Sequence, residues 1–280
     1  MQSVKKFHEA ISAEGMSKKM NNRPIGIFDS GVGGLTVLAK IKQALPGESI
    51  IYFGDTANIP YGGKSPAELL GYGQNIVRFL RKRDVKAVVM ACGSTSSSVY
   101  EELLYENPDL PIVDVIRPGV YACIEMDLMR LGFIATAATI RSGLFAQLYK
   151  KSNPDSRILT RACPLFALMV EAGITHGSVA NWAADVYVGQ WKNKIDGLVF
   201  GCTHYPLLKD ALSHVLGDEI KYIDLGVHTA EVLKSQLIST IGLSDGNPSY
   251  EYYVSGDAES FNKTARFLLQ DSINAISVKL

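Results

Sequence analysis

The chain has 280 residues, 47% of them apolar, and its 28 Lys and Arg residues balance its 28 Asp and Glu residues. This length and composition are typical of a globular protein of one or two domains whose core needs no disulfide staples. The formal net charge of zero excludes the overall electrostatic footprint of a protein that binds nucleic acid or an anionic membrane.

Apolar strands alternate with helical patterns along the first half of the chain. Strands are predicted at Ile25–Phe28, Ser49–Phe53 and Lys86–Ala91, and helices at Leu35–Leu45 and Pro66–Arg83. Such alternation, with nearly continuous apolar strands, favours an α/β fold built on a mainly parallel sheet flanked by helices. We interpret Asp114–Pro118 as a crossover between two halves, because Pro118 disfavours helix in the residue just before it.

The second half repeats this alternation. Strands are predicted at Gly132–Ala135, Ser156–Thr160 and Gly197–Phe200, and helices at Ser142–Lys150, Pro164–Glu171 and Val179–Lys194. Ile223–Gly226 is interpreted as the return to the first half. The tail is predicted to form a helix at His228–Ile241, a strand at Glu251–Val254 and a helix at Phe261–Leu269, and to pack back on the first half, since the second already has its strands.

Three elements recur in the same order in the two halves, which indicates a duplicated unit. Ile27 corresponds to Ile134 and Ile51 to Ile158 at one offset, and Cys92 corresponds to Cys202 at nearly the same offset. Ordinary periodicity of two α/β halves is the alternative explanation. The predicted architecture is two pseudo-symmetric α/β domains with a site at their interface: 23–115 with 227–280 in the first, and 116–226 in the second.

The N-terminal segment 1–22 is interpreted as an extension, in which Phe7, Ala10 and Ile11 favour one short amphipathic helix. It has no apolar stretch long enough for a signal peptide, and no segment of the chain approaches a membrane span. We therefore expect a cytoplasmic protein whose cysteines stay reduced: Cys92, Cys123, Cys163 and Cys202. None of these has the CxxC spacing of a metal or redox site, so no metal is expected.

Ligands of open α/β sheets bind beyond the carboxyl ends of the strands, so the residues that follow each predicted strand are candidates for a site. They combine thiols, a carboxylate, an imidazole, a phenol and several hydroxyls: Asp29–Gly31, Gly54–Thr56, Ile59–Gly62, Cys92–Thr95, Thr136, Thr139, Cys163, Pro164 and Cys202–His204. Two thiols from duplicated units suit a reaction whose substrate and product are mirror images, because one thiolate removes a proton from one face while the other thiol delivers one to the opposite face. A free thiol is only about a few per cent ionised at neutral pH, so Asp29 and His204 are candidates for tuning or relaying protons.

Three stretches resemble the glutamate racemases of the aspartate/glutamate racemase superfamily: PIGIFDSGVGGLTVL (24–38), YFGDTANIPYGGKS (52–65) and GCTHYPLL (201–208). ATAATIRSG (135–143) and ACPLFALMVEAG (162–173) resemble them too, so the likeness runs from residue 24 to 226. It implies a cofactor-independent isomerase, with neither metal nor pyridoxal, that interconverts L- and D-glutamate by two-cysteine proton transfer. It also implies a role in peptidoglycan synthesis, cell-wall biogenesis and cell shape, with glutamate as the ligand and a homodimer as the assembly.

The same resemblance implies the site residues. Cys92 and Cys202 would be the catalytic pair, assisted by Asp29, Glu171 and His204. Substrate binding would fall to eleven residues, two of which are also in the catalytic set: Asp29, Ser30, Pro60, Tyr61, Gly62, Gly93, Ser94, Thr136, Thr139, Thr203 and His204.

One position departs from the family pattern. The family usually has Cys-Asn-Thr after the first strand-end cysteine, whereas this chain has Cys92, Gly93, Ser94 and Thr95. Gly93 lacks the amide that both donates and accepts hydrogen bonds. Two alternatives to a glutamate racemase therefore stay open, namely a racemase of the same superfamily with another amino-acid substrate and a glutamate-binding homologue without turnover.

Structural roles compete with several of these functional roles. Asp29 is equally suited to cap the following helix, Tyr61 to turn chemistry, and Glu171 to a solvated helix end, while Cys123 and Cys163 are interpreted as packing residues. The glycines of Gly31–Gly34 match a dinucleotide fingerprint only in part, because Thr36 stands where its third glycine belongs. We expect them instead to let the backbone turn tightly beside a small anion.

Overall fold

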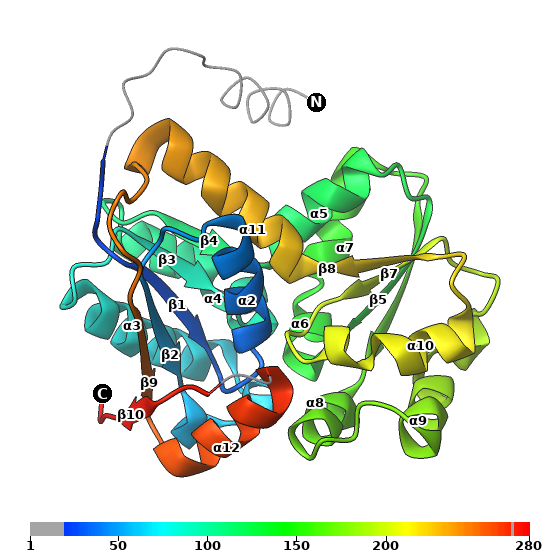
Figure 1. The fold of residues 1–280 in the computed structure, drawn as a ribbon. Coiled ribbons are helices and arrows are strands. Elements are labelled where there is room, and N and C mark those ends of the chain that lie inside the picture. Colours follow the sequence, from blue (N-terminus) through cyan, green and yellow to red (C-terminus); the bar gives the residue numbers. More distant parts are fainter. Residues whose placement is uncertain (1–19, 270–271) are drawn as a thin grey trace.

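The computed structural model describes residues 20–269 and 272–280, and these form two parallel sheets with helices on both faces of each (Figure 1). The first sheet has the strand order β10-β9-β2-β1-β3-β4. Its strands are β1 (Ile25–Asp29), β2 (Ile50–Gly54), β3 (Ala87–Met90), β4 (Ile112–Asp114), β9 (Tyr250–Val254) and β10 (Ala275–Ser277). The tail strand β9 pairs with β2, so the tail contributes strands to the first sheet.

The second sheet has the order β6-β5-β7-β8. Its strands are β5 (Arg130–Ala135), β6 (Arg157–Ala162), β7 (Gly197–Phe200) and β8 (Lys221–Asp224). This order is that of β2-β1-β3-β4 in the first sheet, and the strands correspond in the way that the duplicated pattern predicts. The strands before Cys92 and Cys202, β3 and β7, therefore occupy equivalent places next to the two central strands β1 and β5.

Each sheet has one layer of helices on each of its two faces. In the first half the helices are α2 (Leu35–Ala44), α3 (Pro66–Arg81), α4 (Gly93–Glu106), α11 (Leu225–Gln236) and α12 (Ala258–Leu269). In the second half they are α5 (Ile116–Glu125), α6 (Ala137–Ser142), α7 (Leu144–Ser152), α8 (Pro164–Glu171), α9 (Ser178–Val188) and α10 (Lys209–Leu216). Figure 1 shows α2 and α11 on the side of the first sheet that faces α5 and α7 of the second half.

Local sequence explains several of the helix boundaries. Ser65 caps α3 because its hydroxyl accepts the Glu68 amide while the Glu68 carboxylate accepts the Ser65 amide, which forms a capping box. Thr136, which directly follows β5, caps α6, since its hydroxyl accepts the Thr139 amide.

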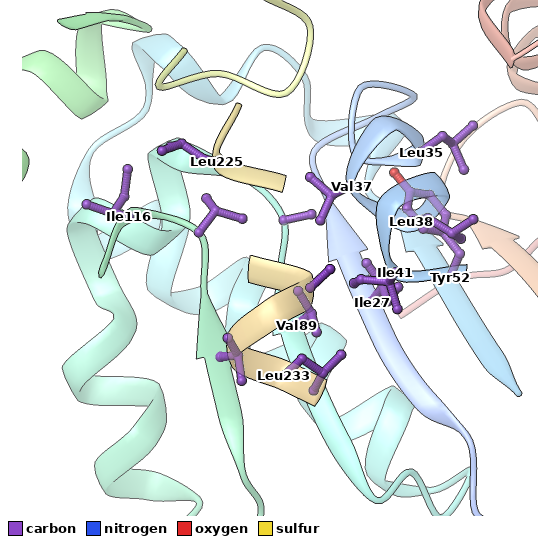
Figure 2. Close-up of a cluster of buried hydrophobic side chains, with 14 of the residues drawn as sticks. Ile27, Leu35, Val37, Leu38, Ile41, Tyr52, Val89, Ile116, Leu225 and Leu233 are labelled. Carbon is purple, nitrogen blue, oxygen red and sulfur yellow. The ribbon is translucent and has the colours of Figure 1, made fainter. Parts of the chain in front are cut away.

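One buried core is shared by both halves (Figure 2). It joins the first sheet and α2, represented by Ile27 and Val37, to α5 and α11, represented by Ile116 and Leu225. Two further cores lie on the outer faces, one under α3 and α4 and the other under α8, α9 and α10. Because apolar burial stabilises by about 25 cal/mol per Å², the shared core holds the two sheets in one arrangement.

Both segments interpreted as crossovers contain strands, which corrects the sequence interpretation. Asp114 ends β4, an edge strand of the six-stranded first sheet, and Asp224 ends β8, an edge strand of the four-stranded second sheet. Pro118 does not stop a helix, since α5 begins at Ile116 and places the proline in its first turn, where no intrahelical N–H is needed.

Two predicted helices end earlier than expected. The segment predicted as a helix at 228–241 begins instead at Leu225 and is followed after Gln236 by a π-helical turn at Leu237–Ile241. The helix predicted at 179–194 ends at Val188, before a 3₁₀ turn at Gly189–Trp191. β10 was not predicted, because its three residues carry too short a pattern.

The amphipathic helix predicted around Phe7 lies outside the described residues. From Met20 onward the chain runs beside Leu243, to whose carbonyl the Asn21 amide donates at 2.9 Å. None of the helices between residues 20 and 280 that are described has both the length and the apolar composition to cross a membrane.

Candidate active site between the two sheets

The candidate residues lie where the carboxyl ends of the strands of the two sheets face each other. Two hydrogen bonds cross from one half to the other at this place: the Ser94 and Thr136 hydroxyls are 2.9 Å apart, and the Thr36 hydroxyl donates to the Thr203 carbonyl at 2.9 Å. The topology thus brings together polar groups that are far apart in sequence.

Cys92 follows β3 and stands at the N-cap of α4, with 5% of its surface exposed. Burial raises the pKa of its thiol to about 12, and the negative charge of Asp29 adds to this effect. The hydroxyl and amide of Thr95 act in the opposite direction, since they stabilise the thiolate. Without a ligand Cys92 is therefore a protonated thiol at neutral pH.

Asp29 is the last residue of β1 and is almost completely buried. Its Oδ2 accepts the amides of Gly31 at 3.2 Å and Gly34 at 2.9 Å, whereas its Oδ1 is buried with no hydrogen-bond partner among the described residues. Burial raises the pKa of this carboxyl, while the charge of His204 and the backbone amides lower it. One oxygen thus holds the turn before α2, as a cap would, and the other remains available to a ligand.

Cys202 lies after β7 within reach of an imidazole. Its Sγ is 3.6 Å from His204 Nδ1, and His204 Nε2 is 3.0 Å from Glu171 Oε1. Burial alone lowers the pKa of His204, but its contacts with Cys202 and Glu171 and the charges of Cys202 and Asp29 raise it, to about 10 overall. The imidazole is therefore a cation at neutral pH, placed between a thiol and a carboxylate that each favour that charge.

The two sides of the site are unequal. Cys92 has a carboxyl group and a hydroxyl as neighbours, whereas Cys202 has an imidazolium. The charge of Asp29 disfavours a thiolate at Cys92, whereas the imidazole ring of His204 lies within hydrogen-bond distance of the Cys202 sulfur.

A row of hydroxyls lines the junction of the halves. The Thr136 hydroxyl lies 2.9 Å from that of Ser94 and 3.0 Å from that of Thr139. Ser94, Thr139 and Thr203 are all buried, and Ser30 and Thr136 are half-buried. Hydroxyls both donate and accept, so this row suits a ligand that carries carboxylate and ammonium groups together.

The loop after β2 is organised by Asp55, which is one of the strand-end candidates but has no place in the predicted catalytic or substrate-binding sets. The Asp55 carboxylate accepts from the Tyr61 hydroxyl at 2.5 Å, from Asn58 at 3.0 Å and from Ser255 at 2.6 Å. The Tyr61 hydroxyl is therefore hydrogen-bonded within the loop. Pro60, which precedes it, is exposed. The only signal for Asp55 in the sequence is its position directly after a strand, which it shares with Asp29.

Gly33 and Gly34, after β1, must be glycine because neighbouring atoms leave no room for a side chain at either position. A methyl group on Gly33 would lie 2.4 Å from both the His204 ring and the Thr203 hydroxyl, and one on Gly34 would lie 2.4 Å from Asp29 Cβ. The amides of this turn face the Asp29 carboxylate. The expected small anion is thus a side chain of the protein itself, and the other half of the molecule fills the space beside Gly33.

Of the other two cysteines, Cys123 lies away from these contacts, whereas Cys163 lies in the same core as Cys202, whose charge helps to raise the pKa of the Cys163 thiol. Cys123 lies in the shared core on α5, where burial raises its pKa to about 12, and Cys163 lies in the core under α8, where burial raises its pKa as well. Within the part of the chain that the structure describes, no imidazole or carboxylate perturbs the pKa of either thiol.

Comparison with known proteins agrees with this arrangement. The pattern of the Asp/Glu/Hydantoin racemase family matches residues 25–232. A glutamate racemase of Geobacter metallireducens is 43% identical over 253 residues, which cover 88% of this chain and 93% of that protein.

Solved structures agree as well. The glutamate racemase of Francisella tularensis in complex with D-glutamate has a TM-score of 0.86 at 35% identity and covers 92% of this chain and 98% of its own. That of Thermus thermophilus in complex with β-chloro-D-alanine has a TM-score of 0.85 at 35% identity, with coverages of 94% and 99%. The chain with its two strand-end cysteines therefore belongs to the Asp/Glu/Hydantoin racemase family, among the glutamate racemases.

Proposed function

We propose that this protein interconverts L- and D-glutamate by moving a proton at the α-carbon between the thiols of Cys92 and Cys202. The observation that carries the proposal is that the two cysteines follow equivalent strands of two facing sheets and have unlike neighbours. The likeness to racemases named for glutamate supports the substrate.

The first step takes place at whichever cysteine is ionised. With the charge on the Cys202 side, its thiolate removes the α-proton, so that a Cα–H bond breaks and an S–H bond forms. The imidazolium of His204 loses a thiolate neighbour in this step and keeps its Glu171 contact.

The second step completes the inversion from the opposite face. The Cys92 thiol gives its proton to the carbanion, a new Cα–H bond forms, and Cys92 becomes the thiolate. Asp29 is placed to take part in returning Cys92 to the thiol, because its charge disfavours the Cys92 thiolate. Release of product and exchange of one proton with solvent restore the starting charges.

The remaining groups hold the substrate and stabilise the carbanion. Fixed donors around the α-carboxylate act on charge that develops during proton removal, and the hydroxyls of Ser94, Thr136, Thr139 and Thr203 supply them. The unpartnered Oδ1 of Asp29 suits the ammonium group. The acid and the base are both side chains of the chain itself, and the proposal needs no cofactor.

The biological setting and the assembly are part of the proposal. D-Glutamate made in the cytoplasm would serve peptidoglycan synthesis. A homodimer is supported by large apolar side chains that α8 and α9 leave exposed, namely Leu165, Leu168, Val179, Trp182 and Val186, since exposed apolar patches mark interfaces. Sedimentation velocity tests the dimer.

Isotope exchange in deuterium oxide tests the chemistry. Starting from L-glutamate, the product D-glutamate should carry α-deuterium, and Cys92→Ala and Cys202→Ala should each lower racemisation by at least about 1000-fold. Cys123→Ala is the matched control, because it removes an equally buried thiol outside the site, and it should retain turnover.

Three outcomes would contradict the proposal. Near wild-type turnover in either site variant would remove the two-thiol mechanism. An inert glutamate together with an active aspartate or hydantoin would assign another substrate, and glutamate binding without α-proton exchange would indicate a binding protein.

A further inference from the structure

We propose that Gly93 and Gly201 meet in a backbone contact that sets the separation of the two reactive thiols. The inference rests on the proposed proton transfer between Cys92 and Cys202. It gives the departure at Gly93 a positive role, namely that of a positioning residue.

In this arrangement of the two halves, the contact leaves no room for a side chain at position 93. A methyl group on Gly93 would lie 2.3 Å from the Gly201 carbonyl oxygen, well inside the 3.0 Å that Cβ atoms keep from other atoms, and 3.3 Å from the carbonyl carbon. The obstacle is backbone, which cannot rotate away as the end of a side chain can.

Gly201 cannot move away from this contact, because packing and a hydrogen bond within the second half hold it in place. The Phe133 ring and the Ala135 Cβ lie 2.5 and 2.8 Å from where a methyl group on Gly201 would be, and its amide donates to the Ile134 carbonyl at 2.8 Å. The end of β7 is thus packed directly on β5, and its carbonyl acts as a fixed stop for the other half.

The stop lies next to both thiols. Gly93 directly follows Cys92, and Gly201 directly precedes Cys202. A shift that opens this contact therefore moves the two sulfurs apart by a comparable distance, with no flexible segment between them to absorb it.

Other contacts between the halves are less rigid. The position of Gly33 is limited by side-chain atoms of His204 and Thr203, and a methyl group on Gly62 would meet Thr136 Cβ at the milder distance of 3.1 Å. Among these three glycines of the first half, Gly93 alone has backbone of the second half within 3.0 Å of where its methyl group would lie; the corresponding backbone distance for Gly62 is 3.9 Å, to the Ala137 amide nitrogen.

The separation matters because two sulfurs must reach one carbon from opposite faces. A misplacement of about 1 Å between reacting groups costs about 100-fold in rate. A wider gap still allows one thiolate to remove the α-proton, but the opposite thiol no longer delivers its proton in time. The thiol that took the α-proton then exchanges its S–H with solvent and returns a solvent-derived proton to the same face of the carbanion, so that an S–H bond breaks, a Cα–H bond forms and, in deuterium oxide, deuterium enters L-glutamate without inversion.

The Gly93→Ala variant tests this directly. Incubation with L-glutamate in deuterium oxide gives two quantities, α-deuterium in recovered L-glutamate and α-deuterium in D-glutamate. We expect racemisation to fall by about 100-fold and the ratio of exchange to inversion to rise at least about tenfold. Gly63→Ala is the matched control, since a methyl group there meets nothing within 4 Å, and it should leave both quantities unchanged.

The outcomes separate this inference from the proposed function. A wild-type protein that does not racemise glutamate removes the function itself. A Gly93→Ala variant in which exchange and inversion fall together indicates a blocked substrate and overturns the inference, as does one with an unchanged ratio or a Gly93→Asn variant with increased activity. If Gly93→Ala does not fold by circular dichroism, Gly62→Ala forces a smaller opening, and an unchanged ratio in that variant overturns the inference equally.

Discussion

At the scale of single residues, the contact between His204 and Glu171 controls the pH range of the site. Glu171 helps to raise the pKa of His204 to about 10, so its neutralisation lowers that pKa and the imidazolium is lost at a lower pH. We expect Glu171→Gln to move the alkaline limb of the kcat/KM profile to lower pH, with activity beyond the limb falling about tenfold per unit of displacement.

The measurement is racemisation followed by circular dichroism across the alkaline range. Glu102→Gln, a change at an exposed position of α4, serves as the control and should leave the profile in place. An alkaline limb that Glu171→Gln does not move would show that His204 does not carry the titration.

Some site residues are readable from sequence and others are not. Asp29, Cys92 and Cys202 are found because strand ends are where parallel sheets present their side chains. Asp55 stands at an equivalent place but its partners, among them Ser255, come from the far end of the chain. The contact of Gly93 with Gly201 depends on the placement of the other half, which no local pattern encodes.

At the scale of elements, one buried ion pair fastens the amino ends of the strands. Lys86 Nζ lies 2.6 Å from Glu48 Oε2 and donates to the carbonyls of Asn21 and Gly242 at 2.7 and 3.1 Å. The Lys86 side chain is 0% exposed and that of Glu48 is 2% exposed. The pair joins segments before β1, β2 and β3 to the turn that follows α11.

We expect Lys86→Met to lower the free energy of unfolding by about 3–5 kcal/mol, because it leaves a buried carboxylate unpaired. Lys86→Met combined with Glu48→Gln should recover part of the loss, since no unpaired charge remains. Urea unfolding measures both variants. Arg23→Ala breaks an exposed pair with Asp84 and should cost less than about 1 kcal/mol. A double variant no more stable than Lys86→Met would contradict this account.

The errors in the predicted elements have two physical causes. β4 and β8 are three and four residues long, and a strand this short shows no alternation before its sheet partner is known. Pro118 was judged by the rule for the residue before a proline, but the first turn of a helix tolerates proline. Long segments such as α3, with a capping box and an apolar face, were predicted nearly to their ends.

At the scale of the whole molecule, the pKa of His204 links stability to pH. The folded protein holds this proton to about pH 10, against 6.5 as the ordinary value. The native state therefore binds more protons than the unfolded state between these limits. The stabilisation is complete below the lower limit and is lost as pH rises through the upper one, with a slope of up to about 1.4 kcal/mol per pH unit.

We expect the free energy of unfolding to fall between about pH 7 and about pH 9, before the buried Cys92 thiol, whose pKa is about 12, adds its own decline. His204→Gln should flatten this slope, whereas a change at the exposed His176 should not. Urea unfolding at several pH values measures the slope, and an equal slope in His204→Gln and the wild type would argue against a charged, buried His204.

The overall arrangement was predictable from repetition more than from any single element. The recurring order of strands and cysteines predicted two related sheets, and the family likeness supports that arrangement. Repetition does not say how the two sheets approach each other. That depends on the shared core around Val37, Ile116 and Leu225 and on the contacts of Gly33, Gly62 and Gly93.

The pairing of β9 with β2 has a consequence for synthesis on the ribosome. When translation has passed Asp224, every strand of the second sheet has emerged, whereas one edge of β2 stays open until Tyr250–Val254 arrives. The later-made sheet is thus the earlier one to be completed, which reverses the usual vectorial order in which N-terminal units close first. Until β9 is made, the unpaired backbone N–H and C=O groups at the edge of β2 are accessible to chaperones or to neighbouring chains.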